Sequence, residues 1–325
     1  AGTARRAEEQ PVGAQPDRPA HHAQEPVVVR GSRNSLESEI ALEDMAATRD
    51  AARVPGLEAR KAAARLLAAV VDRKTPLDGL TDAEHGNPAY LALEPRDRAL
   101  VRAILATALR FRNTIAALIA ARLDRPLPAN AQALSHLLHV AAAQMLFLDV
   151  PDSAAVDLAV EHAKSDPRTA RFAGLVNGVL REIGRRKERA LPAVLAKTVD
   201  APDWFAAMLR EAHGAEKAAA ILAIHRSEAP TDFTVKAGPE RWARELGGFV
   251  LPGGTVRVPR LDRAVSGLPG YGDGQWWVQD FSAALPARLL GDVEGRRVLD
   301  LCAAPGGKTA QLALAGARVT AVEKS

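Results

Sequence analysis

The order strand, glycine-containing loop, helix and strand at the end of the sequence constrains the fold most. Residues 297–301 (Arg-Val-Leu-Asp-Leu) have the pattern of a buried strand, and residues 302–308 contain two adjacent glycines. Residues 309–314 are rich in alanine and leucine, and residues 318–322 (Arg-Val-Thr-Ala-Val) have the pattern of a second strand. Two strands joined through a helix pair in parallel, because the crossover is right-handed. The order predicts one βαβ unit of a doubly wound, Rossmann-like sheet, preceded by a helix over 282–290.

Two parallel strands leave one edge and one face of such a sheet open to water. We therefore expect the domain that begins at residue 266 and reaches residue 325 to be incomplete as written. The sequence also starts at Ala1 rather than at a methionine, so we expect that its beginning is not the native start.

Helical spacing of apolar residues dominates the region from 55 to 193. Alanine and leucine are abundant and aromatic residues make up only 4% of the sequence, which indicates a helical core. Proline residues separate the segments, and Pro95 suits the first turn of a helix. The pattern predicts an all-helical domain, with helices from Leu57, from Pro95, and at about 113–122, 130–147, 153–164 and 168–189.

The region from 194 to 265 changes from helical to strand-like patterns. Helices are expected near 202–213 and 215–226, followed by short strands at 232–236 and 255–258 with glycine turns between them. This order predicts a small mixed α/β subdomain or linker.

Residues 1–54 are rich in Ala, Pro, Arg and Glu and show little periodicity, so we expect a disordered tail. The formal net charge is +4 and the pI is about 9.4, which makes a polyanionic partner plausible. A single cysteine, Cys302, excludes an internal disulfide and a cysteine-based zinc site. We expect no bound metal, no membrane association and a cytoplasmic protein, since neither a long apolar run nor a signal-peptide pattern occurs.

The loop Asp300-Leu301-Cys302-Ala303-Ala304-Pro305-Gly306-Gly307-Lys308-Thr309 carries the chemistry of the sequence. Small residues let the backbone approach a ligand, and the helix that follows presents N–H groups. Glu323 ends the next strand, where an acid accepts hydrogen bonds from a ribose diol. This pattern indicates a nucleoside-containing cofactor without choosing among S-adenosylmethionine (SAM), NAD and a nucleotide.

Two other phosphate-binding motifs fit poorly. A P-loop requires a leading glycine where Cys302 stands, and Pro305 removes a backbone donor from the cradle. The dinucleotide motif Gly-x-Gly-x-x-Gly is not matched. An NTPase and an NAD enzyme are both disfavoured.

The loop resembles SAM-binding motif I of the cytosine-C5 RNA methyltransferases, and residues 277–282 resemble the element that precedes it in these enzymes. Residues 168–181 are similar to the last helix of NusB-like RNA-binding domains. A NusB-like domain joined to this motif is the arrangement of the bacterial Sun/Fmu (RsmB) family. The resemblance covers residues 57–325 and implies SAM as cofactor and a cytosine in small-subunit (16S) ribosomal RNA as substrate.

The resemblance implies that SAM is bordered by the loop from Cys302 through Ala303, Ala304, Pro305, Gly306 and Gly307 to Lys308, with Glu323 at its ribose. The family more often has aspartate at that acid. Addition of a thiolate to C6 activates the C5 carbon of cytosine, and the family uses two cysteines for attack and release. Neither cysteine segment occurs in residues 1–325, so we expect no catalytic residue before Ser325 and no methylation by this chain alone.

A basic run near the end of the helical region is the expected RNA-binding surface, formed by Arg181, Arg185, Arg186, Lys187 and Arg189. A solvated helix end is the ordinary explanation of such a run. His136 and His139 stand three positions apart, and we interpret them as polar residues on a helix surface rather than metal ligands.

Two functional hypotheses follow. The first is a SAM-dependent methyltransferase of ribosomal RNA, monomeric by preference. The second is a non-catalytic NusB-like RNA-binding protein that serves antitermination or ribosome assembly. Salt-dependent RNA binding by the helical region alone would favour the second.

Overall fold

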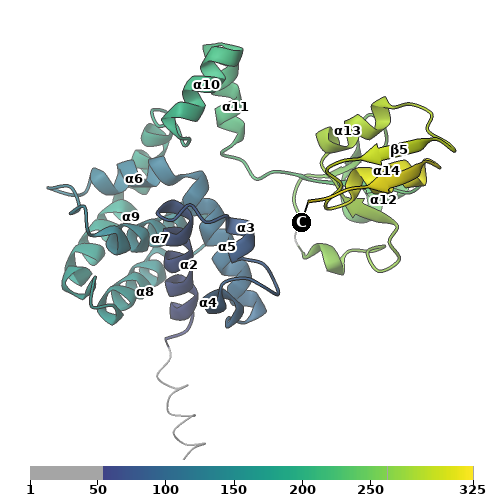
Figure 1. Ribbon diagram of the computed structural model, residues 1–325. Coiled ribbons are helices and arrows are strands. Elements are labelled where there is room, and N and C mark those ends of the chain that lie inside the picture. Colours follow the sequence, from purple (N-terminus) through teal and green to yellow (C-terminus); the bar gives the residue numbers. More distant parts are fainter. Residues whose placement is uncertain (1–53, 262, 325) are drawn as a thin grey trace, which may run out of the picture. The chain divides into compact units, whose positions relative to one another are not determined.

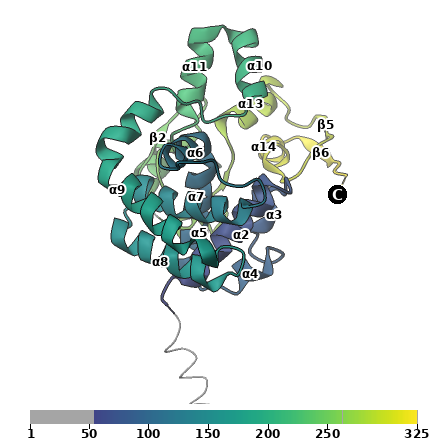
Figure 2. The ribbon, with the colours of Figure 1, turned by 90° about the vertical axis from the view of Figure 1, so that its left-hand side faces the viewer.

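The computed structural model describes residues 54–261 and 263–324. The expected disordered tail lies outside the described residues except for Val54. The all-helical part shown in Figures 1 and 2 contains α2 (Leu57–Val71), α3 (Leu77–Leu80), α4 (Pro88–Leu91), α5 (Pro95–Arg110), α6 (Arg112–Ala120), α7 (Gln132–Phe147), α8 (Asp152–Ser165), the short 3-10 helix η1 (Ala170–Phe172) and α9 (Ala173–Leu195). The helices predicted from Leu57 and from Pro95 are confirmed at their first residues.

Helix α7 forms the centre of this helical part. Its residues from Leu134 to Met145 are all buried except Ser135, which is half-buried. A helix that is apolar on every side is stable only when other helices surround it. Helices α2, α5, α6, α8 and α9 pack against it. The largest buried side chains of the cluster include Leu138 and Leu180.

The helix predicted over 168–189 begins later and ends later than expected. Asp166 stops α8 and its carbonyl accepts the N–H of Ala170, so the chain makes a 3-10 turn before α9 begins. The hydroxyl of Thr169 donates to the carbonyl of Ala163 at 2.9 Å and fixes this turn. At its other end α9 continues through Pro192, which is tolerated because its missing N–H affects only the carbonyl of exposed Glu188.

The interpretation of two histidines as residues on a helix surface is wrong. His136 and His139 are buried, with 3% and 4% of their surfaces exposed. The Nε2 atom of His136 lies 2.8 Å from the carboxylate of Asp72, and Nδ1 of His139 lies 2.8 Å from the carbonyl oxygen of Ser135. Burial lowers the pKa of His139 to about 4.

A helical hairpin follows, formed by α10 (Asp203–His213) and α11 (Ala215–Ile224) and joined by Gly214 at φ 77°. The segment before it is anchored by Asp200, whose side chain is only 2% exposed. This carboxylate accepts the backbone N–H and the hydroxyl of Thr114, at 2.8 and 2.7 Å, and so caps the first turn of α6. It also accepts Nε of Arg226 at 2.9 Å, which ties the end of the hairpin to the same point.

A mixed unit begins at β1 (Thr231–Val235) and continues with α12 (Pro239–Leu246), β2 (Phe249–Val250), β3 (Val256–Val258), η2 (Val265–Gly267) and β4 (Trp276–Val278). The strands form an antiparallel sheet in the order β2-β3-β1-β4. Trp242 and Leu246 of α12 are buried with Phe233 and Trp276. The predicted strands correspond to β1 and β3. The domain boundary between 265 and 266 stays a prediction, and β4 beyond it pairs with β1.

The last elements are α13 (Phe281–Leu289), β5 (Arg297–Asp300), α14 (Gly307–Leu314) and β6 (Arg318–Ala321). Strands β5 and β6 pair in parallel, with Val298 opposite Val319, as the sequence predicts. Buried Val293 and Leu312 form a small core beside these strands.

Among the described residues, no single helix is long and apolar enough to cross a membrane. Helices α5 and α6 reach the required length and composition only as a pair, and the pair is bent by 75°.

Replacing Asp200 with alanine should lower the free energy of unfolding by about 2–4 kcal/mol, because it leaves Nε of Arg226 and the two Thr114 donors without their acceptor. Urea denaturation followed by circular dichroism measures this loss. The matched control is Asp203→Ala, which removes an exposed carboxylate from the first turn of α10 and should cost less than about 1 kcal/mol. Equal losses in the two variants would contradict the anchoring role of Asp200.

Acidification should destabilise the helical part through His139. Its pKa is about 4 in the folded protein and 6.5 in the unfolded chain, so the unfolded chain binds a proton first as the pH falls. The stabilisation is complete above pH 6.5 and is lost between pH 6.5 and about 4. When the pH falls from 7 to 5, the free energy of unfolding should decrease in both proteins. We expect this decrease to be about 2 kcal/mol smaller in His139→Gln than in the original protein. If the free energy of unfolding depended on pH in the same way in both proteins, His139 would not be the source of the acid destabilisation.

Candidate functional site

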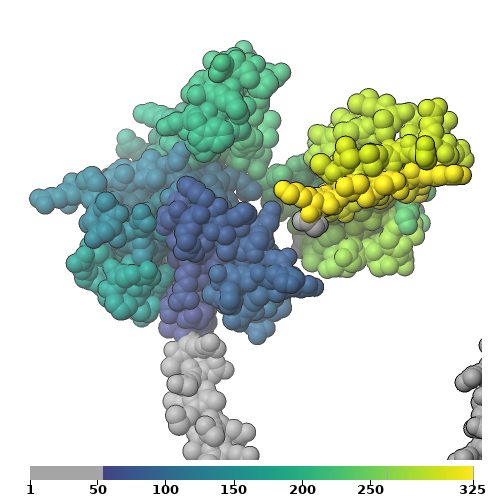
Figure 3. All heavy atoms as spheres, viewed as in Figure 1, coloured from purple at the N-terminus to yellow at the C-terminus, as the bar shows by residue number. Residues whose placement is uncertain are grey.

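The loop between β5 and α14 is built from small residues and lies at the surface. Gly306 has φ 98°, a left-handed conformation that a residue with a Cβ rarely adopts, and open space surrounds the position of a Cβ there. The amide of Gly306 donates to the carbonyl of Ala303 at 2.6 Å, which closes a tight turn. In Figure 3 the last residues of the chain, in yellow, lie at the surface.

Each residue of the predicted cofactor site has a definite place in this loop. Cys302, Ala304 and Pro305 are exposed, and Glu323 is exposed beyond the end of β6. The four remaining residues are half-buried: Ala303, Gly306, Gly307 and Lys308. The structure therefore brings all eight predicted residues into one short loop and the strand end beside it.

Glu323 is bound directly to the loop. One of its carboxylate oxygens accepts the backbone N–H of Ala304 at 2.9 Å, and the other accepts the N–H of Lys324 at 2.9 Å. These two backbone donors, Ala304 first, hold the pKa of Glu323 below its usual range. A carboxylate has about four acceptor positions, so about two remain for hydroxyl groups of a ligand.

Asp300 shapes the other side of the loop, a role that no prediction assigned to it. Its side chain is 8% exposed and accepts the hydroxyl of Thr309 at 2.7 Å, across the loop that separates the two residues. Its backbone carbonyl accepts the N–H of Val322 at 2.8 Å, and the N–H of Ala303 donates to the carbonyl of Val322 at 3.2 Å. The loop is therefore held at both ends by acceptors on the two strands.

Gln279 connects the loop to the antiparallel sheet and was also missed by sequence reasoning. Its amide oxygen accepts the hydroxyl of Thr234 and the indole N–H of Trp277, both at 2.9 Å. Its amide nitrogen donates to the side chain of Gln311 on α14 at 2.7 Å. A Cβ at Gly307 would lie 3.2 Å from this amide, so the first residue of α14 packs directly on Gln279.

A second connection joins the sheet to α13. Arg257 of β3 binds Asp232 of β1 through two N–H···O contacts of 2.7 Å, and this pairing lowers the pKa of Asp232. The same carboxylate accepts the backbone N–H of Phe281 at 2.9 Å, at the start of α13. These contacts explain why the segment that precedes the loop has a fixed path.

The predicted RNA-binding residues lie on the second half of α9 and differ in their partners. Arg185 and Arg186 both bind Glu182 on the same helix, and more than 60% of each side chain is exposed. Lys187 is more buried and binds Asp152 of α8 at 2.9 Å. Arg189 is exposed and has no ion pair or hydrogen bond with any residue in the described ranges.

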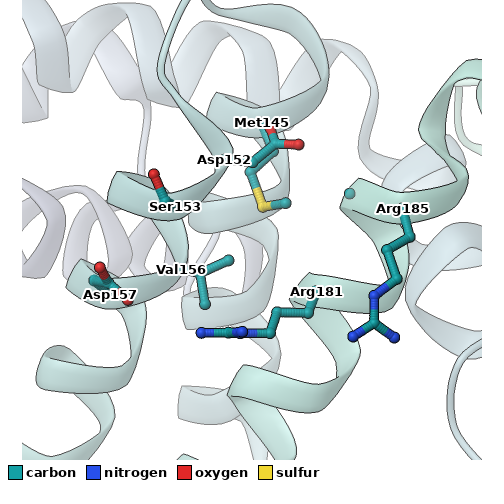
Figure 4. Close-up of a pocket in the computed structure, with 8 residues that line it drawn as sticks. Met145, Asp152, Ser153, Val156, Asp157, Arg181 and Arg185 are labelled. Atoms are coloured by element: carbon teal, nitrogen blue, oxygen red, sulfur yellow. The ribbon is translucent and has the colours of Figure 1, made fainter.

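Arg181 and Arg185 border a pocket of about 290 Å³ between α8 and α9 (Figure 4). The opposite wall carries Asp152, Ser153 and Asp157 of α8. Nε of Arg181 also donates to the side chain of Asn177 at 2.9 Å. The pocket therefore combines cations with carboxylates, and its two arginines keep N–H donors for a further acceptor.

Within residues 54–261 and 263–324 no group of three or more His, Cys, Asp and Glu side chains is arranged to hold a metal ion.

Comparisons with known proteins agree with this architecture. The NusB family model matches residues 57–185. The chain is 39% identical over 267 residues to the ribosomal RNA small subunit methyltransferase B of Xanthomonas campestris pv. campestris, which covers 79% of this chain and 59% of that protein. The protein of the same name from Vibrio cholerae is 32% identical, over 79% of this chain and 60% of its own length.

The chain spans about three fifths of the length of these curated relatives. The crystal structure of the protein PH0851 superposes with a TM-score of 0.53 at 18% identity, over 83% of this chain and 63% of that one. At this identity the likeness shows a shared fold alone. The NusB model covers residues 168–181, which resemble the last helix of NusB-like domains. The chain is thus similar to methyltransferases of this name over 79% of its own length, and its residues 57–185 match the NusB family model.

Proposed function

We propose that this chain serves the SAM-dependent transfer of a methyl group to C5 of a cytosine in small-subunit ribosomal RNA. Its part in the reaction is to bind RNA and SAM. The observation that carries the proposal is the hydrogen bond between Glu323 and the Ala304 amide, because it joins an acid at a strand end to a glycine-containing loop. The names of the relatives from Xanthomonas and Vibrio support the reaction and the substrate.

The loop fits a nucleoside-containing ligand in shape and in charge. The open space at Gly306 leaves room for backbone and ligand to approach each other. The remaining acceptor positions of Glu323 suit the two hydroxyls of a ribose, and Cys302 to Lys308 would border the rest of the ligand. SAM, when bound, supplies the methyl group. In this proposal β5, α14 and β6 belong to a Rossmann-like methyltransferase domain.

Cys302 has a structural role in this proposal. The activation of C5 requires a thiolate that reaches C6 of the target base. Cys302 stands within the loop that borders the cofactor, where the family resemblance implies a backbone contact rather than nucleophilic attack. In this proposal the residues of this chain contribute binding and orientation, and none of them is assigned the attacking thiolate.

RNA binding is assigned to the helical part, with Arg181, Arg185, Arg186, Lys187 and Arg189 of α9 as contacts. Arg181, Arg185, Arg186 and Arg189 are exposed, whereas Lys187 is half-buried and already held by Asp152. Exposed guanidinium groups bind phosphate oxygens through paired N–H donors. The NusB-family match supports this assignment.

SAM should stabilise the chain against thermal unfolding, by about 2.7 kcal/mol at a concentration one hundred times its dissociation constant. Glu323→Gln should weaken SAM binding about tenfold to one hundredfold, because it removes a charged acceptor of the ribose hydroxyls. Differential scanning calorimetry at several SAM concentrations measures both effects. The matched control is Glu216→Gln, which changes an exposed acid of α11 and should leave SAM binding unchanged.

Absence of stabilisation by SAM in the original chain, with RNA binding retained, would replace the proposal with that of a non-catalytic RNA-binding protein. Equal SAM affinity in Glu323→Gln and in the original chain would remove Glu323 from the cofactor site.

A further inference from the structure

A second site with basic side chains lies in the helical part. It is separate from the predicted RNA-binding residues of α9, which we call the α9 run (Arg181, Arg185, Arg186, Lys187 and Arg189). A cleft of about 680 Å³ is bordered by α2 and the two residues that follow it, by Asn87, by the first two turns of α7 and by the segment from His162 of α8 to Thr169. No residue of α9 lines it. Its volume falls within the range of about 300–1,000 Å³ that is usual for sites of small ligands and cofactors, so it is larger than a single phosphate group needs. The charged residues that line it are Lys61, Arg65, Arg73, Arg168, Asp72 and Asp166.

The two carboxylates of the cleft are already engaged inside it. Asp166 binds the guanidinium of Arg168, with Nη2 and an acid oxygen 2.7 Å apart, and this contact lowers the pKa of Asp166 to about 2. Asp72 lies 2.8 Å from Nε2 of His136. Four cations therefore face two carboxylates, and both of these have partners of their own.

Arg65 and Arg73 are the cations of the cleft that remain available. Both are exposed, and neither makes an ion pair or a side-chain hydrogen bond with a residue that the structure describes. Lys61, by contrast, binds Glu58 on its own helix at 3.0 Å. Two arginines without internal partners that border one cleft present several N–H donors to a ligand, and guanidinium donors match phosphate oxygens.

The cleft is also lined by uncharged side chains. Burial, together with the nearby charges of Lys61 and Arg65, lowers the pKa of His162 to about 4, so this imidazole is neutral at pH 7. Ala64 and Ala68 add short side chains to the wall formed by α2. The cleft thus offers charge on its rim and small or neutral side chains beside it.

We propose that this cleft binds the phosphate groups of a single RNA strand, as a second contact in addition to the α9 run. The choice of RNA rests on the proposed function, whereas the affinity for phosphate rests on the cleft itself. Contacts with the backbone position an RNA without reading its sequence. The cleft therefore serves to hold the substrate rather than to select the cytosine.

The test compares Arg65→Gln/Arg73→Gln with the original chain by fluorescence anisotropy, using a labelled single-stranded RNA of mixed sequence at several salt concentrations. Loss of two phosphate contacts should reduce the slope of log affinity against log salt by about 1.4, at about 0.7 per phosphate, and weaken binding about tenfold. The melting temperature should not change, because neither side chain has a partner in the folded chain. The matched control is Arg125→Gln, an exposed arginine that does not line the cleft.

If the original chain binds RNA and the double variant has the same slope of log affinity against log salt, the cleft does not bind RNA phosphates. The proposed function would not be affected by this result. Absence of RNA binding by the original chain would overturn both. A further measurement tests whether inorganic pyrophosphate binds to the original chain and to the double variant. If the double substitution abolishes pyrophosphate binding but leaves RNA binding unchanged, the cleft belongs to a small phosphate compound and the assignment to RNA is wrong.

Discussion

The hydrogen bond from the Ala304 amide to the Glu323 carboxylate is the contact on which the candidate cofactor site depends. It joins two residues that lie 19 positions apart, and it places the only acid at the end of β6 against the glycine-containing loop. The parallel pairing of β5 with β6 makes this contact possible, because the carboxyl ends of both strands meet at one edge. Asp300 completes the arrangement by holding Thr309 at the start of α14. The carboxylates of Asp300 and Glu323 fix the shape of the loop, and both lie at the carboxyl ends of the parallel strands β5 and β6.

The loop is also connected to the antiparallel sheet through Gln279. This side chain accepts hydrogen bonds from Thr234 and Trp277, donates to Gln311, and packs against Gly307. A buried amide with all of these partners is costly to move, because any shift leaves polar groups without hydrogen bonds. The sheet and the loop therefore form one continuous structure, in which the segment before the loop supports its geometry.

Sequence reasoning was most successful where the pattern was long or chemically distinctive. The apolar periodicity from Leu57 and the proline at Pro95 predicted the starts of α2 and α5, and the alternation of strand, loop and helix predicted β5, α14 and β6. Two short strands were not predicted: β2 has two residues and β4 has three, and both are stabilised by pairing with other strands rather than by local preference alone. The burial of His136 and His139 was missed for a related reason, since their partners and the helices that cover them come from tertiary packing. The roles of Asp300 and Gln279 depend on contacts across the fold that spacing alone does not reveal.

Hydrogen exchange with and without SAM, measured by mass spectrometry on the full chain, tests the central claim most directly. The claim is that the loop of residues 302–308 and the end of β6 hold the cofactor. We expect SAM to slow exchange in peptides that cover residues 300–310 and 318–324, and to leave peptides of α2, α7 and α9 unchanged. Slowed exchange confined to the helical part, or no change at any SAM concentration, would contradict the account.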